Sequence, residues 1–157
     1  MGAQVSGQVK KMYVQLGDQV KQGQLIAQID STTQENSLKT SDANIKNLEA
    51  QRLQQIASLN EKQLEYRRQQ QMYAQDATPR ADLESAEAAY KTAQAQVKAL
   101  DAQIESAKIT RSTAQTNIGY TRIVAPTDGT VVAIVTEEGQ TVNANQSAPT
   151  IVKIGRA

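Results

Sequence analysis

Two kinds of hydrophobic pattern divide the chain into three segments. The middle segment, from Ser31 to Ile118, contains no glycine and only one proline, Pro79, and is rich in Gln, Ala, Glu, Lys and Leu. The flanking segments, residues 1–30 and 119–157, hold all eight glycines and alternate apolar with polar side chains, as half-buried strands do. We therefore expect an α+β fold in which a helical segment, residues 31–118, separates two β-rich segments.

Within the middle segment, apolar residues recur every seven positions, which predicts two long antiparallel helices packed along a narrow seam. In the first helix this phase holds Leu38, Ile45, Leu59, Tyr66 and Tyr73, with Arg52 as the polar exception. In the second helix it holds Leu83, Tyr90, Val97, Ile104, Arg111 and Ile118, and the partner positions hold Ala86, Ala93, Leu100, Ala107 and Ala114. Helices of about 40 residues would give a hairpin of roughly 60 Å.

The ends of the predicted helices carry capping signals. Ser31 or Thr32 can cap the first helix, and Glu35 is placed to reach back to the cap nitrogen. Gly119 is predicted to end the second helix as its C′ residue. These signals set the expected limits of the hairpin.

The tip of the hairpin is predicted at about residues 75–80. Thr78 is a plausible N-cap of the second helix and Pro79 a plausible first helical residue, so turn chemistry alone can explain both. Two arginines below the tip, Arg67 and Arg68, are not explained by the turn. They can pair with Glu65 or Glu84, or they can face a partner.

The two β-rich segments repeat one another. Gly129-Thr130-Val131 matches Gly7-Gln8-Val9, and Gly139-Gln140-Thr141-Val142 matches Gly17-Asp18-Gln19-Val20. The strand predicted at residues 151–154 corresponds to the strand predicted at 25–29. Val5–Val9 and Tyr120–Val124 also have the strand pattern. Neither half has enough apolar surface to fold alone, so we expect one small barrel or sandwich built from both.

Composition excludes several classes of function. Lys plus Arg is 17 and Asp plus Glu is 16, so the formal net charge of +1 is too small to attract nucleic acid or an anionic membrane. Cysteine and histidine are absent, which removes thiolate nucleophiles, imidazole bases and the usual zinc sites. We therefore expect no enzymatic activity, no catalytic residue, no metal and no cofactor.

Gly-x-Val followed by Gly-x-x-Val, present twice, resembles the biotinyl/lipoyl-like fold, and a helical hairpin between the halves resembles the periplasmic adaptors, or membrane fusion proteins (HlyD-like), of bacterial efflux pumps. The run Tyr120-Thr121-Arg122-Ile123-Val124-Ala125-Pro126 is specific for this group and is most similar to its MacA-like macrolide-efflux branch. The resemblance implies a hexamer anchored to the inner membrane in the periplasm. It also implies that a β-barrel domain, a membrane-proximal domain and the anchor lie outside this chain.

The same resemblance implies partners and contact residues. The partners are an inner-membrane ABC transporter (MacB-like) and an outer-membrane TolC-like duct, which the hairpin tips contact. In the family, the tip signature is Arg, three residues, Leu, six residues, then Ser or Thr. Here Arg68 and Met72 take the first two positions, and Pro79 takes the third with Thr78 one place early. Gln146 matches a loop glutamine that narrows the family's channel.

Three other functions stay open. A type I secretion adaptor or an RND efflux adaptor belongs to the same superfamily. A generic coiled-coil interaction protein is a further alternative. In a ring of adaptors, polar helix faces such as Gln69-Gln70-Gln71 could form lateral hydrogen bonds between neighbouring hairpins. A biotin or lipoate carrier is disfavoured, because a carrier presents a lysine at the turn where this chain carries its hairpin.

Overall fold

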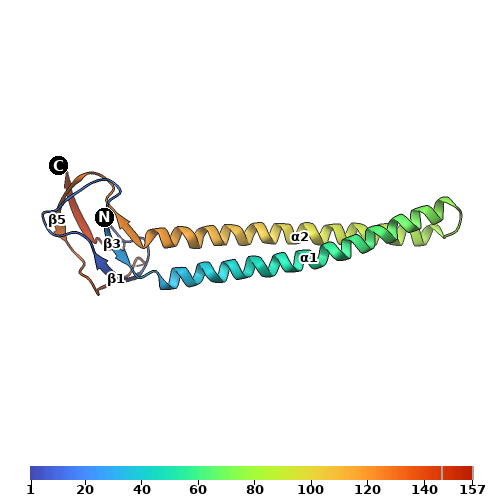
Figure 1. The fold of residues 1–157 in the computed structure, drawn as a ribbon, viewed down its shortest axis with the longest axis horizontal. Helices are drawn as coiled ribbons and strands as arrows, with labels where there is room; N and C mark the ends of the chain where they lie inside the picture. The colour runs from blue at the N-terminus through green and yellow to red at the C-terminus, as the bar shows by residue number, and fades with distance from the viewer. Residues whose placement is uncertain (146, 157) are drawn as a thin grey trace. The chain divides into compact units, whose positions relative to one another are not determined.

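A computed structural model describes residues 1–145 and 147–156, and it confirms the α+β fold (Figure 1). The chain forms two compact units. One contains residues 1–39 and 112–157, and the other contains residues 40–111. The first unit holds all the strands, and the second holds most of the two long helices. The segment boundaries at residues 30 and 118 remain a prediction.

The β-unit consists of two antiparallel sheets. The strands are β1 (Gly7–Met12), β2 (Gln19–Val20), β3 (Leu25–Ile29), β4 (Arg122–Val124), β5 (Gly129–Ile134), β6 (Thr141–Val142) and β7 (Val152–Arg156). Their order is β4-β3-β1-β6 in one sheet and β2-β5-β7 in the other. Each sheet therefore contains strands from both ends of the chain, so each sheet needs both halves to form.

The sequence repeat is reproduced as a structural repeat with reciprocal hydrogen bonds. The amide of Gly17 donates to the carbonyl of Val131 at 2.8 Å, and the amide of Gly139 donates to the carbonyl of Val9, also at 2.8 Å. Both turn glycines have positive φ, 92° and 84°, which a residue with a side chain adopts only at a cost. Each half thus supplies the turn that completes the strand of the other half.

Valine and isoleucine side chains fill the space between the sheets. The members with at most 1% exposure are Val9, Ile26, Ile29, Val131, Ile151 and Val152. Strand β1 approaches β3 so closely that a Cβ on Gly7 would lie 2.6 Å from Cγ2 of Ile29. The equivalent Gly129 has the same relation to Ile154, at 2.5 Å. The two glycines therefore allow paired strands to pack closely within each half.

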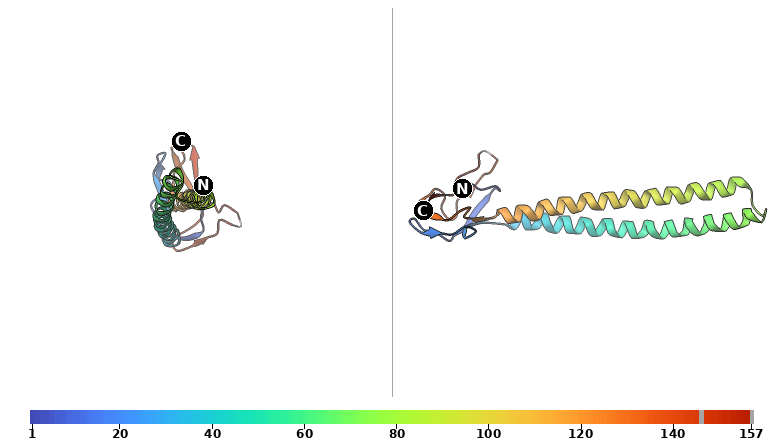
Figure 2. Two further views of the ribbon diagram at one scale, coloured as in Figure 1. Left: turned by 90° about the vertical axis from the view of Figure 1, so that its right-hand side faces the viewer. Right: turned by 90° about the horizontal axis from the view of Figure 1, so that it is seen from above.

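Helices α1 (Thr32–Ala74) and α2 (Arg80–Tyr120) run side by side as an antiparallel pair (Figure 2). Of the predicted seam, the buried members between residues 40 and 111 are Ile45, Ala86, Ala93, Val97, Ile104 and Ala107. Alanine supplies half of this set, and its small side chain allows the two backbones to approach closely. Tyr66 and Tyr90 stack across the seam with ring centroids 5.6 Å apart.

The two arginines in the heptad phase are satisfied across the seam. Arg52 of α1 pairs with Asp101 of α2, and Arg111 of α2 pairs with Asp42 of α1. All four side chains are about 40–50% exposed, so solvent screens both pairs and each adds little net stability. Their main consequence is to fix the register of α1 against α2.

Three predictions about the ends of elements are wrong. Strand β1 begins at Gly7, so Val5 lies before it. Gly119 lies inside α2, which ends one residue later at Tyr120, and the backbone amide and hydroxyl of Thr121 close the helix by donating to the carbonyl of Ile118. Tyr73 is 41% exposed and outside the seam, because α1 ends at the next residue.

The first helix is capped as predicted at Ser31, whose carbonyl accepts the first helical bond from Glu35. Glu35 does not reach the cap nitrogen. Its carboxylate accepts a bond from the Ser31 hydroxyl at 2.6 Å, and Asp30 instead accepts the Thr32 amide at 3.1 Å. The Thr32 hydroxyl, and then its amide, lower the pKa of Asp30. Stability from this contact is therefore present at neutral pH and is lost as the pH falls through that lowered pKa.

Candidate docking site at the hairpin tip

Helix α1 ends in a Schellman motif that sets the direction of the tip. The amide of Ala77 donates to the carbonyl of Met72 at 2.8 Å, and the amide of Asp76 donates to the carbonyl of Tyr73 at 3.0 Å. Asp76 is the left-handed residue of the motif, with φ of 54°, and no other described non-glycine residue has positive φ. The carbonyl of Met72 is therefore held within the turn.

Replacing Asp76 by glycine should stabilise the hairpin. Glycine adopts positive φ without steric cost, and the substitution also removes a negative charge from the negative end of α1. We expect a gain of about 0.5–1 kcal/mol. Thermal unfolding followed by the helical circular-dichroism signal measures it. Ala77→Gly is the matched control, and equal effects of the two substitutions would contradict the assigned motif.

The second helix begins at Arg80, one residue later than predicted for a helix with Pro79 at its first position. The carbonyl of Pro79 accepts from the amide of Asp82 at 3.2 Å, so Pro79 is the residue that precedes the first turn. The hydroxyl of Thr78 donates to Oε1 of Gln69 at 2.9 Å. Thr78 thus ties the turn back to α1, whereas the prediction made it the cap of α2.

A continuous set of hydrogen bonds connects Thr78 to Arg68. Gln69 accepts from Thr78 through Oε1 and donates through Nε2 to Glu65 at 3.0 Å. The other carboxylate oxygen of Glu65 accepts from the Arg68 guanidinium at 2.9 Å. This confirms one of the two predicted partners of Arg68. The link through Gln69 was not predicted, because no sequence pattern shows that the turn folds back by nine residues.

The residues of the family signature differ in exposure. The Arg68 side chain is 67% exposed and only its Glu65 side is occupied, so most of the guanidinium faces solvent. Met72 and Thr78 are half-buried, and Pro79 is exposed. The structure therefore places a cation and a thioether one helical turn apart, beside a turn held by side-chain hydrogen bonds.

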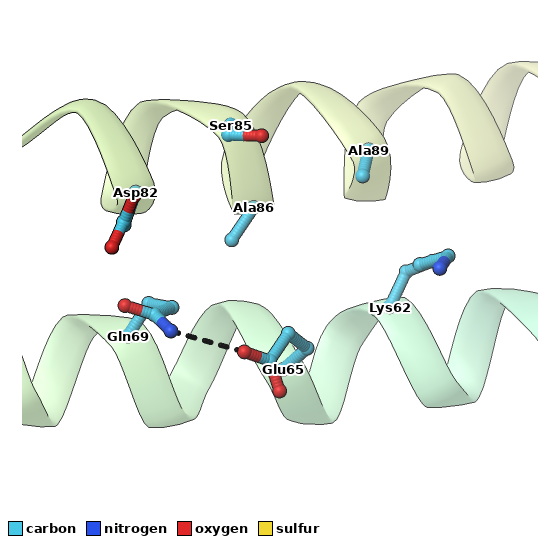
Figure 3. Close-up of a pocket in the computed structure, with 7 residues that line it drawn as sticks. All are labelled: Lys62, Glu65, Gln69, Asp82, Ser85, Ala86 and Ala89. Atoms are coloured by element: carbon cyan, nitrogen blue, oxygen red, sulfur yellow. Dashed lines mark hydrogen bonds between the residues drawn. The ribbon is translucent and has the colours of Figure 1, made fainter.

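A groove of about 280 Å³ lies beside this network, between the two helices. We call it the tip groove, and it is lined by Lys62, Glu65, Gln69, Asp82, Ser85, Ala86 and Ala89. Figure 3 shows Ala86 and Ala89 of α2 pointing toward α1, with the bond between Gln69 and Glu65 on the other side. Two alanine methyl groups among the polar side chains of both helices make the groove amphipathic.

The remaining predicted site residue, Gln146, lies outside the described residues. Among those described, no cluster of potential metal ligands occurs. No helix among the same residues has the length and apolar character that a bilayer span requires.

Comparisons with known proteins all match this chain to bacterial export proteins and membrane fusion proteins. The family model for the barrel-sandwich hybrid domain of RND membrane fusion proteins matches residues 1–154. The macrolide export protein MacA of Escherichia coli O157:H7 is 44% identical over 154 residues, which are 98% of this chain and 42% of that protein. The pyoverdine export membrane fusion protein PvdR of Pseudomonas putida is 43% identical over 156 residues, 99% of this chain and 40% of that protein.

Among solved structures, MacA from Actinobacillus actinomycetemcomitans superimposes with a TM-score of 0.94 at 44% identity. The match covers 99% of this chain and 48% of that one. The chain therefore spans less than half the length of these relatives.

Proposed function

The chain belongs to the membrane fusion protein family of efflux adaptors, and from this membership we propose that it joins an inner-membrane transporter to an outer-membrane duct. The full-length protein would be a periplasmic subunit of a tripartite pump. It would be anchored to the inner membrane and would line the conduit for macrolides or similar substrates. The observation that carries the proposal is a long helical hairpin with Arg68 exposed near its tip.

The duct is proposed to be TolC-like and to bind the tip through Arg68, Met72, Thr78 and Pro79. Arginine is suited to this contact, because its planar fork can bond carbonyl or carboxylate oxygens on a partner. Met72 can fill an intersubunit groove of the duct. Thr78 keeps a structural role, because its hydroxyl already donates to Gln69. Pro79 stands exposed where the family signature has a hydroxyl.

The transporter is proposed to be an ABC protein similar to MacB, because a macrolide export protein is 44% identical to this chain. An RND transporter is the second candidate, because the matched family model is described by that class. Deleting the gene in its host should increase macrolide susceptibility, and the full-length protein should restore resistance. Unchanged susceptibility would contradict macrolide export. Transport into vesicles that needs ATP favours the ABC partner, whereas transport that needs a proton gradient favours the RND partner.

The full-length protein is proposed to assemble as a homo-oligomer, with six copies around the conduit as the family resemblance implies. The family resemblance would then make Gln146, which follows β6 (Thr141–Val142) in the sequence, the residue that narrows the channel. Replacing Gln146 by alanine should change the rate of export and leave the fold intact, because the described core cluster is formed by other residues. Export assays with purified full-length pump components measure this effect. The neighbouring substitution Ser147→Ala serves as control. Equal export by wild type and Gln146→Ala would contradict the proposed role of Gln146 in narrowing the channel.

A further inference from the structure

One face of the hairpin carries two exposed leucines, Leu53 at 70% and Leu64 at 61% exposure. They are eleven residues apart on α1, close to three full turns, so they lie on the same face. Arg67 follows Leu64 by three residues on that face, is exposed, and has no ion pair with any described residue. We call Leu53, Leu64 and Arg67 the leucine ridge.

The opposite face of the hairpin carries two grooves. One is the tip groove, and the other has about 410 Å³ and is lined by five glutamines together with Ala99 and Leu100. We call the second the glutamine groove. Gln51 of the glutamine groove precedes Leu53 by two residues, and Lys62 of the tip groove precedes Leu64 by two. Two residues turn an α-helix by about 200°, so each leucine points away from the groove beside it.

Each leucine is also level with its groove along the hairpin. The ion pairs Arg52–Asp101 and Asp42–Arg111 are ten residues apart on both helices, which fixes how α1 and α2 align. In this alignment Leu53 lies level with Leu100, and Leu64 lies level with Ala89. Leu100 lines the glutamine groove and Ala89 lines the tip groove. Each exposed leucine therefore lies at the same position along the hairpin as one of the two grooves.

We propose that the leucine ridge of one copy of this protein docks into the two grooves of the next copy. This inference rests on the proposed function, in which copies surround a conduit, and it assigns the surfaces that join them. Such a contact is heterologous, because different faces meet, and repeated heterologous contacts form a ring when the rotation between copies closes. Copies arranged around an axis parallel to their hairpins are not shifted along it, so each leucine must meet a groove at its own height.

The chemistry of the two faces is complementary. Leu53 would meet Ala99 and Leu100 within a rim of glutamine amides, and Leu64 would meet the methyl groups of Ala86 and Ala89. Arg67 on the ridge would approach Asp82, which lines the tip groove and has no ion pair with any described residue. A two-fold dimer would instead place ridge against ridge and leave both grooves empty.

Disulfide trapping tests the proposal, because the chain has no cysteine of its own. The full-length protein carrying Leu53→Cys and Ala99→Cys, treated in cell membranes with a mild oxidant, should give a ladder of multimers that ends at the closed ring. Leu64→Cys with Ala89→Cys should give the same ladder. Adding Arg67→Asp should weaken the ladder of the first pair, and a further Asp82→Arg should restore it.

Matched variants decide between arrangements. Leu53→Cys with Lys98→Cys should give no multimers, because Lys98 does not line the groove. The absence of a ladder from both groove pairs would overturn the proposal. Dimers formed by Leu53→Cys alone would also overturn it, because they would indicate the two-fold dimer. Trapping of a different protein by Ala99→Cys would also overturn it. Each of these failures leaves the proposed duct contact at the tip intact, since that contact is measured separately.

Discussion

Replacing Arg68 by aspartate is expected to reduce export to the level of a strain without the protein. The side chain is 67% exposed, so the substitution places no charge in a core and leaves the hairpin folded. At an interface the reversal removes a cation that the duct would bind and puts an anion in its place. Truncating a central interface arginine typically costs about 2–4 kcal/mol, and charge reversal costs at least as much. Resistance to macrolides in complemented cells measures the effect.

Arg80→Asp is the matched control for this prediction. Arg80 is also exposed at the tip, at 77%, and also has an ion pair within its own helix, with Glu84, but it lies outside the family signature. Circular dichroism and multimer trapping should be unchanged in both variants. Normal resistance with Arg68→Asp, or equal loss with both substitutions, would contradict the assignment of the contact to Arg68.

Replacing Ile26 by alanine should produce the largest loss of stability. Ile26 has no exposed surface and lies between the two sheets, so the substitution leaves a cavity that neighbouring side chains fill only partly. We expect the free energy of unfolding to fall by about 2–5 kcal/mol. Because both sheets contain strands from both halves of the chain, the whole β-unit should unfold together. Urea titration followed by the β-sheet circular-dichroism signal measures the change.

Val132→Ala is the control for Ile26→Ala, because Val132 is in the same unit and 56% exposed. Its substitution should change the free energy of unfolding by less than about 0.5 kcal/mol. Equal losses for the two variants would show that the space between the sheets is not the core of this unit.

The fold could be predicted because its main signals are local or repeated. The match between the glycines at 7 and 129 predicted two equivalent strands, and the reciprocal bonds of Gly17 and Gly139 now give the physical basis of the repeat. The seven-residue spacing predicted the seam, including the two arginines within it. Their partners, Asp42 and Asp101, were not predicted, because the alignment of the two helices depends on where the turn ends.

The errors lie where a residue has two possible roles. Glycine is common just after the end of a helix, and this predicted a helix end at Gly119. The hydroxyl of Thr121 instead closes the helix one residue later. Threonine is a preferred N-cap residue, and this predicted that Thr78 caps α2. Its hydroxyl instead donates to Gln69 across the turn. The candidate site was predicted by resemblance rather than by chemistry, because an adaptor has no catalytic group whose spacing could be recognised.

Trapping the tip against the outer-membrane duct tests the central proposal most directly. The full-length protein with Met72→Cys, in cells that carry the duct, should form a covalent adduct with it when treated with a short thiol-reactive photo-cross-linker. Thr78→Cys should form the same adduct, and Lys108→Cys, on α2 away from the tip, should form none. Docking through the tip predicts adducts at residues 72 and 78 that disappear with Arg68→Asp. Adducts at Lys108→Cys without any at the tip would contradict it.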